Sequence, residues 1–263
     1  MGVPIFINCR DRWSVLLELI EWLERAGCEE IYLLDNDSRY QPLLDYYDKT
    51  PHTVLRFDIN YGKNALWESG AIELAAGRPY VYTDPDVVPA PECPLDALDH
   101  FADLLERYPA VNKVGFGLRL DDLPDHYRHK EAVLTWEGQM WGWPVERNVF
   151  YAPIDTTFAL HRAGGTRARN ALRTGHPYVA RHDGWYLDLD NLSEDEAFYQ
   201  QHAAESTEQS PGTSHWGAEE LPEDLVAAVE RVRGTHVSPL VRMSNKVRWT
   251  LRGRRSLRRR PTP

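Results

Sequence analysis

The stretch Tyr80-Val81-Tyr82-Thr83-Asp84-Pro85-Asp86 decides the fold of this 263-residue chain. Its first four residues are β-branched or aromatic, which is typical of a strand, and Pro85 marks a turn. Two acids flank that proline. We therefore predict a strand over Tyr80–Thr83 whose carboxyl end carries Asp84 and Asp86.

Strand and helix patterns alternate on both sides of this stretch, through about residue 120. Strands are predicted at Val3–Asn8, Ile31–Leu34, Thr53–Phe57 and Lys113–Leu118, and helices at Gln41–Tyr47, Asn64–Ala76 and Leu95–Tyr108. A further helix is expected from Ser14, which can cap it, with Leu16, Leu19, Ile20 and Leu23 on one face. Such alternation predicts an α/β fold with a mostly parallel sheet flanked by helices.

The rhythm is lost over residues 121–150 and resumes in part afterwards. A strand is predicted at Thr156–His161 and an apolar segment at Pro177–Ala180. Ser193 and Glu196 have the spacing of a capping box, which predicts a helix over 194–204. We expect one domain over 1–205, a linker with a C-terminal helix at 222–233 over 206–241, and a basic tail over 242–263.

The charge of the chain is unevenly distributed. Residues 242–263 carry +9, so the net charge of −10 leaves −19 on the rest. An acidic body argues against nucleic-acid binding. The tail suits either peripheral contact with an anionic membrane or full solvation.

The other compositional features predict a cytoplasmic protein. The chain has no apolar run near the roughly 18 residues of a membrane span, and no signal-peptide pattern. Its three cysteines are widely spaced and form no zinc motif. At 42% hydrophobic residues, the chain has enough apolar material for a sizeable core.

Polar residues follow each of the first four predicted strands. In parallel α/β sheets, ligands bind beside the carboxyl ends of the strands, so these residues are expected to converge on one site. They are Asn8 and Arg10 after the first strand, Asp35 after the second, Asn60 and Gly62 after the third, and Asp84 and Asp86 after the fourth.

Asp84 and Asp86 are the sharpest chemical signal. Two carboxylates one residue apart can turn toward one hard cation, and Mn²⁺ or Mg²⁺ bound there would bridge diphosphate oxygens. A simple turn around Pro85 is the alternative.

The chain resembles family 2-like glycosyltransferases with the GT-A fold over roughly residues 3–200. The elements of the resemblance are Asn8-Cys9-Arg10-Asp11, the Asp35–Ser38 run, Asn60 with Gly62, Tyr82–Asp86, Asp155–Leu160, and Arg181-His182 with Trp185-Tyr186. Their order and spacing together carry the likeness. The resemblance implies transfer of a sugar from a nucleotide-diphosphate sugar to an acceptor hydroxyl on a glycan or a lipid-linked saccharide.

The resemblance also implies roles for the donor-site residues. Asp35 would meet the nucleotide base or ribose, and a capping role for it is equally expected. Asn60 and Gly62 would line the nucleotide pocket together with Asn8 and Arg10. Asp86 would bind the metal directly, while Asp84 would contact ribose, metal or both. His182 would be a further metal ligand, with His161 and His176 as alternatives.

Asp155 is the expected catalytic base, because the resemblance places an acid that faces the acceptor just before this strand. Asp121, Asp122 and Asp125 are its rivals, since the chain lacks the Glu-Asp pair of many family 2 members. Trp136, Trp141 and Trp143 are candidates for an acceptor platform, or for ordinary packing.

The sequence therefore predicts a metal-dependent glycosyltransferase, with inversion at the sugar by analogy alone. A sugar-phosphate nucleotidyltransferase is one rival, and it is disfavoured because residues 8–12 contain no glycine. An inactive GT-A-like scaffold is the other, and the Asp84–Asp86 pair counts against it.

Overall fold

The structure, a computed structural model, describes residues 2–164, 170–203 and 226. The basic tail lies outside the described residues, as does the predicted linker except for Val226. The strands are β1 (Ile5–Cys9), β2 (Ile31–Asn36), β3 (Thr53–Phe57), β4 (Tyr80–Thr83), β5 (Val87–Pro89), β6 (Lys113–Leu118), β7 (Pro144–Glu146), β8 (Val149–Tyr151), β9 (Ala159–His161) and β10 (Ala171–His182). The helices are α1 (Ser14–Arg25), α2 (Gln41–Tyr47), α3 (Ala65–Glu68), α4 (Ala97–Arg107), α5 (Lys130–Glu137) and α6 (Glu194–Ala203), with 3₁₀ turns η1 (Gly62–Asn64), η2 (Ala71–Ala75), η3 (Gly138–Trp141) and η4 (Asp183–Trp185).

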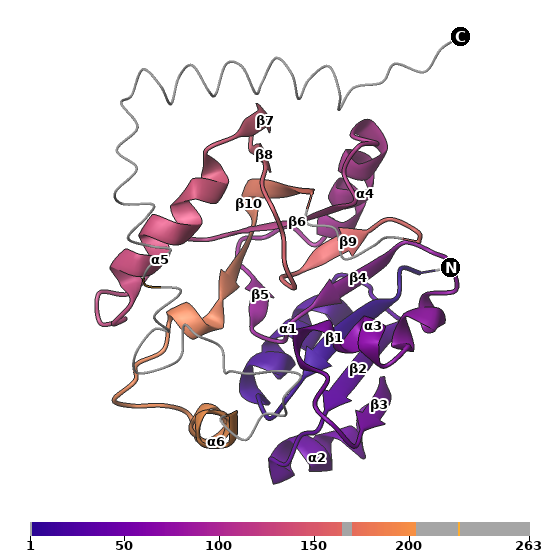
Figure 1. Ribbon diagram of the computed structural model, residues 1–263, viewed down its shortest axis with the longest axis vertical. Coiled ribbons are helices and arrows are strands. Elements are labelled where there is room, and N and C mark those ends of the chain that lie inside the picture. The colour runs from indigo at the N-terminus through magenta and orange to yellow at the C-terminus, as the bar shows by residue number, and fades with distance from the viewer. Residues whose placement is uncertain (1, 165–169, 204–225, 227–263) are drawn as a thin grey trace.

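The strands of the described residues form one sheet in the order β3-β2-β1-β4-β9-β6-β10-β8-β7, with β5 paired to β10 (Figure 1). Neighbours among β3, β2, β1 and β4 are parallel, as are β6 and β10. β9 lies between β4 and β6 and is antiparallel to both. The predicted α/β class, with a mostly parallel central sheet flanked by helices, is confirmed.

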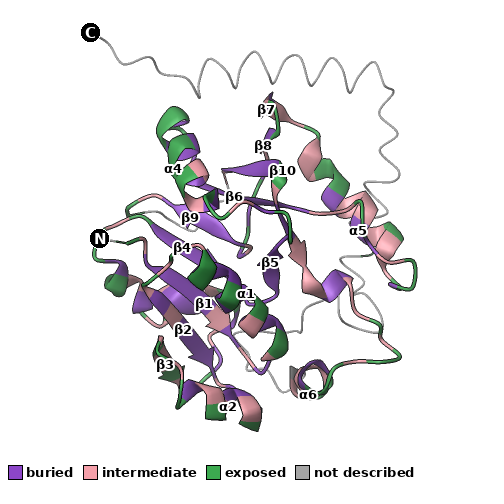
Figure 2. Cartoon of the chain, turned by 180° about the vertical axis from the view of Figure 1, so that it is seen from behind, coloured by how far each residue is buried: buried purple, intermediate pink, exposed green. Residues whose placement is uncertain are grey.

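Helices cover both faces of the sheet. On one face, Leu16 and Leu19 of α1 pack with Ile5, and Phe101 of α4 packs edge-on against Phe116. On the other face, Leu66 and the η2 turn cover the aromatic side chains of β1 and β4. Figure 2 shows the buried strands between partly exposed helices. Each fully buried Leu or Phe contributes about 1.5–3 kcal/mol to the stability of the fold. The two layers of helices therefore hold the sheet, and with it the carboxyl ends of its parallel strands, in place.

Three predicted elements differ from the structure by more than two residues. The helix predicted over Asn64–Ala76 is broken into α3 and η2, because Gly70 has a φ of +79°. The strand predicted over Thr156–His161 begins only at Ala159, since Thr156 lies in a loop against Asp84. The apolar segment Pro177–Ala180 is part of the longer strand β10, which bulges between Thr174 and Val179.

The N-terminus of α1 is capped from a distant segment instead of by Ser14. Ser14 is the first helical residue, and Asp195 of α6 accepts hydrogen bonds from the backbone N–H groups of Trp13 and Ser14 at 2.9 and 2.7 Å. The capping box of α6 is half formed: the Glu196 N–H donates to Ser193 at 3.4 Å. The Glu196 carboxylate pairs instead with Arg12, so α6 is held against α1.

In the part of the chain that the structure describes, no helix is both long and apolar enough to cross a bilayer.

Candidate functional site

The carboxyl ends of β1, β2 and β4 bring the predicted donor-site residues together. The Asn8 amide at the end of β1 donates to the Gly62 carbonyl at 3.3 Å and to Asp84 Oδ1 at 3.5 Å. Asn8 Oδ1 and the Arg10 Nε are buried without a hydrogen-bond partner among the described residues. Buried polar groups normally have a hydrogen-bond partner, so both atoms are exceptions among the side chains of this region.

Side-chain amides fix the loop that carries Gly62. Asn36 donates to the Gly62 carbonyl at 3.0 Å and accepts from the Tyr61 N–H at 2.6 Å. Asn60 accepts from the Gly62 N–H at 2.8 Å. Gly62 has a φ of +67°, a conformation that favours glycine. The loop is therefore pre-formed beside the strand ends.

Asp35 is buried and already has partners. Its carboxylate accepts from the Ser38 N–H at 3.0 Å and pairs with Arg56 at 3.2 Å. Burial raises the pKa of Asp35, while Ser38 and Arg56 oppose that rise. The predicted capping role of Asp35 is thus present, and Arg56 adds a half-exposed cation next to it.

Asp84 lies in a negative and poorly solvated environment. Thr156 donates to its Oδ2 at 2.5 Å, and Asn8 makes the longer contact described above. Burial and the charge of Asp86 raise the pKa of Asp84 to about 7, with a smaller contribution from Asp155. Among the described residues, no cation forms an ion pair with the Asp84 carboxylate.

Asp86 is compensated by a buried cation. Arg12 donates from Nη1 to Asp86 Oδ2 at 2.6 Å, and its Nε pairs with Glu196 at 2.7 Å. The Arg12 guanidinium also stacks 4.0 Å from the Tyr199 ring. Although burial opposes the effect, His182 and Arg12 lower the pKa of Asp86. The sequence reasoning missed Arg12, because its partners are 74 and 184 positions away.

The predicted metal ligands fit a cation in part. No group of three or more His, Cys, Asp or Glu side chains with metal-binding geometry occurs among residues 2–164 and 170–203. Asp84 offers carboxylate oxygens with an uncompensated charge, as a hard divalent cation requires. Asp86 shares its Oδ2 with Arg12. The His182 Nε2 lies 4.0 Å from that same oxygen.

The alternative histidine ligands lie elsewhere. His161 is stacked on Tyr80 at the amino end of β4, whereas Asp84 and Asp86 follow its carboxyl end. Burial lowers its pKa to about 3, so it is a neutral packing residue. His176 lies on the bulge of β10 next to Glu92, 3.8 Å away.

Asp155 is placed by the reversed direction of β9. Because β9 is antiparallel to β4, the residues that precede it lie at the edge where β4 ends, and Asp84 N–H donates to the Thr156 carbonyl at 3.2 Å. The Asp155 carboxylate is 46% exposed and pairs with Lys63 at 2.9 Å. Lys63 follows Gly62 directly, so this ion pair joins the loop of Asn60 and Gly62 to the predicted base.

The rival acids lie beside other elements. Asp121 and Asp122 both pair with Arg119, and Asp125 pairs with Lys130. Of the three tryptophans, Trp141 lines a cavity next to Arg119, which the other two do not line.

No protein-family model matches the sequence, and no curated protein matches it. Among solved structures, a cytidylyltransferase from Leptospira borgpetersenii serovar Hardjo-bovis (strain JB197) has 16% identity and a TM-score of 0.34, over 47% of this chain and 56% of that one. A mycobacterial protein has 16% identity and a TM-score of 0.35, over 61% of this chain and 53% of that one. The chain thus spans little more than half of each. Similarity at this level does not establish an activity.

Proposed function

We propose that this chain transfers a sugar from a nucleotide-diphosphate sugar to an acceptor hydroxyl. The observation that carries the proposal is the uncompensated Asp84 carboxylate at the carboxyl edge of β4. Asn8 and the loop of Asn60 and Gly62, which we assign to the nucleotide and call the nucleotide loop, lie next to it, and Asp155 is near enough to raise its pKa. A buried acid with a pKa shifted toward neutrality is a common mark of a functional site.

The donor would be held by the strand ends. The Asp35 carboxylate would accept hydrogen bonds from the base or the ribose, and Arg56 next to it offers a positive charge. Asn8 Oδ1 and Arg10 would supply further polar contacts. A Mn²⁺ or Mg²⁺ ion, when bound, would be held by Asp84 and Asp86 next to His182, and would neutralise charge on the diphosphate.

Asp155 would act on the acceptor. Its carboxylate takes the proton of the acceptor hydroxyl while the hydroxyl oxygen bonds to the sugar carbon and the bond from that carbon to the diphosphate breaks. The nucleoside diphosphate leaves with the bonding electrons. The exposure of Asp155 lets an acceptor reach it, and Lys63 fixes its position relative to the nucleotide loop.

Calorimetric titration tests the donor site. UDP-, GDP-, CDP- and dTDP-glucose are titrated with and without MnCl₂ into wild type, Asp84→Asn and Asp125→Asn. We expect one nucleotide to bind more tightly with Mn²⁺, Asp84→Asn to lose that gain by at least about tenfold, and the exposed control Asp125→Asn to behave as wild type. Absence of binding across the panel contradicts the proposal.

Product analysis separates the reaction classes. Release of nucleoside diphosphate from the bound donor supports the glycosyltransferase. Formation of pyrophosphate from a nucleoside triphosphate and a sugar 1-phosphate would instead identify a nucleotidyltransferase. Binding of the donor with neither product would identify a scaffold.

A further inference from the structure

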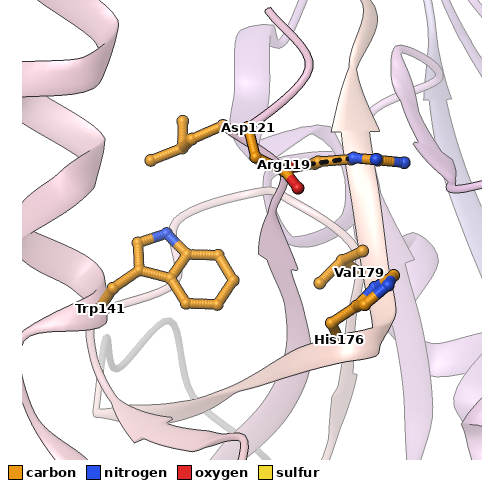
Figure 3. Close-up of a pocket in the computed structure, with 6 residues that line it drawn as sticks. Arg119, Asp121, Trp141, His176 and Val179 are labelled. Carbon is orange, nitrogen blue, oxygen red and sulfur yellow. Dashed lines mark hydrogen bonds and ion pairs between the residues drawn. The ribbon is translucent and has the colours of Figure 1, made fainter.

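A cavity of about 310 Å³ lies next to Arg119, and none of the residues that line it belongs to the donor site proposed above. It is lined by Arg119, Leu120, Asp121, Trp141, His176 and Val179 (Figure 3). The figure shows the Trp141 indole on one side, facing Val179 and His176 on the other. Its volume is at the small end of the roughly 300–1,000 Å³ of ligand pockets, which suits a single small ring. We call it the Trp141 pocket.

The strand register places this pocket on the same sheet face as Asp84. Tyr82 of β4 and Gly115 of β6 both pair with Ala159 of β9, so the residues two positions later, Asp84 and Gly117, also lie on that face. The Trp141 ring covers Gly117, where an added Cβ would approach the ring within 2.9 Å. Two strand spacings amount to about 10 Å, so the pocket and Asp84 lie within one substrate's reach.

The aromatic wall is held rigid. The Trp141 ring packs edge-on against Phe150, with ring centroids 5.1 Å apart and an angle of 68°. The backbone of Gly117 supports it from the sheet side. With Val179 and Leu120, the indole gives the cavity an apolar surface that suits the C–H face of a ring.

The rim of the pocket is acidic; it consists of Arg119 and Asp121 of the lining, with Glu92 and Asp122 next to Arg119. Arg119 contacts three carboxylates: Glu92 at 2.7 Å, Asp121 at 2.9 Å and Asp122 at 3.1 Å. The hydrogen bond from Arg119 lowers the pKa of Asp121, which is therefore ionised at neutral pH. One guanidinium among three carboxylates leaves the rim negative, so an anion entering it would meet like charges.

We propose that the Trp141 pocket binds an uncharged pyranose ring, with its C–H face on Trp141 and its hydroxyl groups toward Asp121 and His176, and that it rejects anionic sugars. The role of that ring as acceptor rests on the proposed function, in which Asp155 is the base that acts on the acceptor. The preference for neutral rings rests only on the lining and the rim.

Ligand-observed saturation-transfer NMR on the full chain, without nucleotide, tests the preference. The probes are the methyl glycosides of glucose, galactose and mannose, together with glucuronic acid and glucose 6-phosphate. We expect at least one neutral glycoside to bind, and the anions to bind at least about tenfold more weakly at low salt. No binding by any neutral glycoside overturns the proposal, and so does equal or tighter binding of an anion.

Variants locate the binding. Trp141→Ala should weaken glycoside binding at least about tenfold, whereas Trp136→Ala, outside the pocket, should leave it unchanged; the reverse pattern overturns the proposal. If Trp141→Ala does not fold, Glu92→Gln with Asp121→Asn retains the packing and should bring the affinities for anionic and neutral sugars together. Unchanged discrimination in that variant overturns the proposal. Because no nucleotide or turnover is involved, a failure here is distinct from a failure of the donor test.

Discussion

Asp84 and Asp86 are separated only by Pro85, but they lie in opposite electrostatic environments. Asp84 faces Asn8, Thr156 and Asp155, and its pKa rises to about 7. Asp86 faces Arg12 and His182, and its pKa is lowered. The motif is nearly symmetric in sequence, and only the distant residues that pack against each acid distinguish the two.

This difference indicates which of the two carboxylates is free of an ion pair and can bind a cation. The charge of Asp86 is largely spent inside the fold, where Arg12 and Glu196 tie the end of β4 to α6. The charge of Asp84 has no such partner among the described residues, so we expect an incoming cation to stabilise this acid most. We therefore propose that Asp86 mainly stabilises the fold and that Asp84 mainly serves the reaction. Four experiments test this proposal.

Loss of Arg12 should have the largest effect on stability. Arg12→Met leaves Asp86 and Glu196 buried without their cation, and breaking such a pair is expected to lower the free energy of unfolding by about 3–5 kcal/mol. Urea denaturation measures it, with Arg39→Met as control, since Arg39 pairs at the surface. A loss below about 1 kcal/mol would show that Asp86 does not depend on Arg12.

Asp155→Asn should mainly affect turnover. We expect a decrease of about 10²-fold, the low end of general-base catalysis, with donor affinity nearly unchanged. Steady-state kinetics with calorimetry separates the two quantities. Near-normal turnover would transfer the role of base to another acid, of which Asp122 is next in line.

Asp84→Asn should change how stability depends on pH. A carboxyl whose folded pKa lies above its unfolded value binds more protons when folded. The contribution of Asp84 to stability is therefore fully present below about pH 4 and is lost as pH rises to about 7. Removing the acid should flatten this slope by up to about 1.4 kcal/mol per pH unit.

Unfolding titrations between pH 4 and 8 measure this slope. Asp183, whose pKa burial and Asp86 raise to about 6, contributes with the same sign over a window that ends lower. Asp183→Asn is therefore the matched comparison. An equal slope in Asp84→Asn and wild type would mean that the Asp84 charge is compensated after all.

Asp195→Ala should give the smallest effect. It removes the acceptor for the Trp13 and Ser14 N–H groups at the start of α1, and loss of such a cap costs about 1 kcal/mol. Thermal unfolding at fixed pH measures it. A loss as large as that of Arg12→Met would mean that α6 is held by its helix cap and not by the buried ion pair.

The sequence predicts the local elements of the first half well. β4 and β6 have the predicted bounds, because each is a short β-favouring run with clear ends. Only part of β10 is predicted from the sequence. The bulge at His176–Pro177 interrupts its strand pattern, and no local pattern indicates that the two parts belong to one strand. α5, β7 and β8 were not predicted, because polar and aromatic residues alternate there with neither the period of a helix nor that of a strand.

The site could be predicted only where its residues follow strands. The convergence of Asn8, Asn60, Gly62 and Asp84 follows from the parallel arrangement of β3, β2, β1 and β4. The partners that set their charge could not be predicted, since Arg12, Thr156 and Glu196 are distant in sequence and only packing brings them close. Arg12 directly follows the Asn8-Cys9-Arg10-Asp11 motif, but a lone arginine before a helix gives no indication of two buried acids.

The position of β9 has a consequence for the order of assembly. β4 and β6 are not paired with each other; each pairs with β9, which is synthesised about forty residues after β6. Until Ala159–His161 emerge, a nascent chain can complete only the β3-β2-β1-β4 part of the sheet, because both neighbours of β6, namely β9 and β10, are synthesised after it. The edge of β4 stays open meanwhile, and open edges invite pairing with other chains. Sheets that depend on such distant pairings form slowly. During synthesis, the chain is thus most exposed to aggregation just before the central strand is complete.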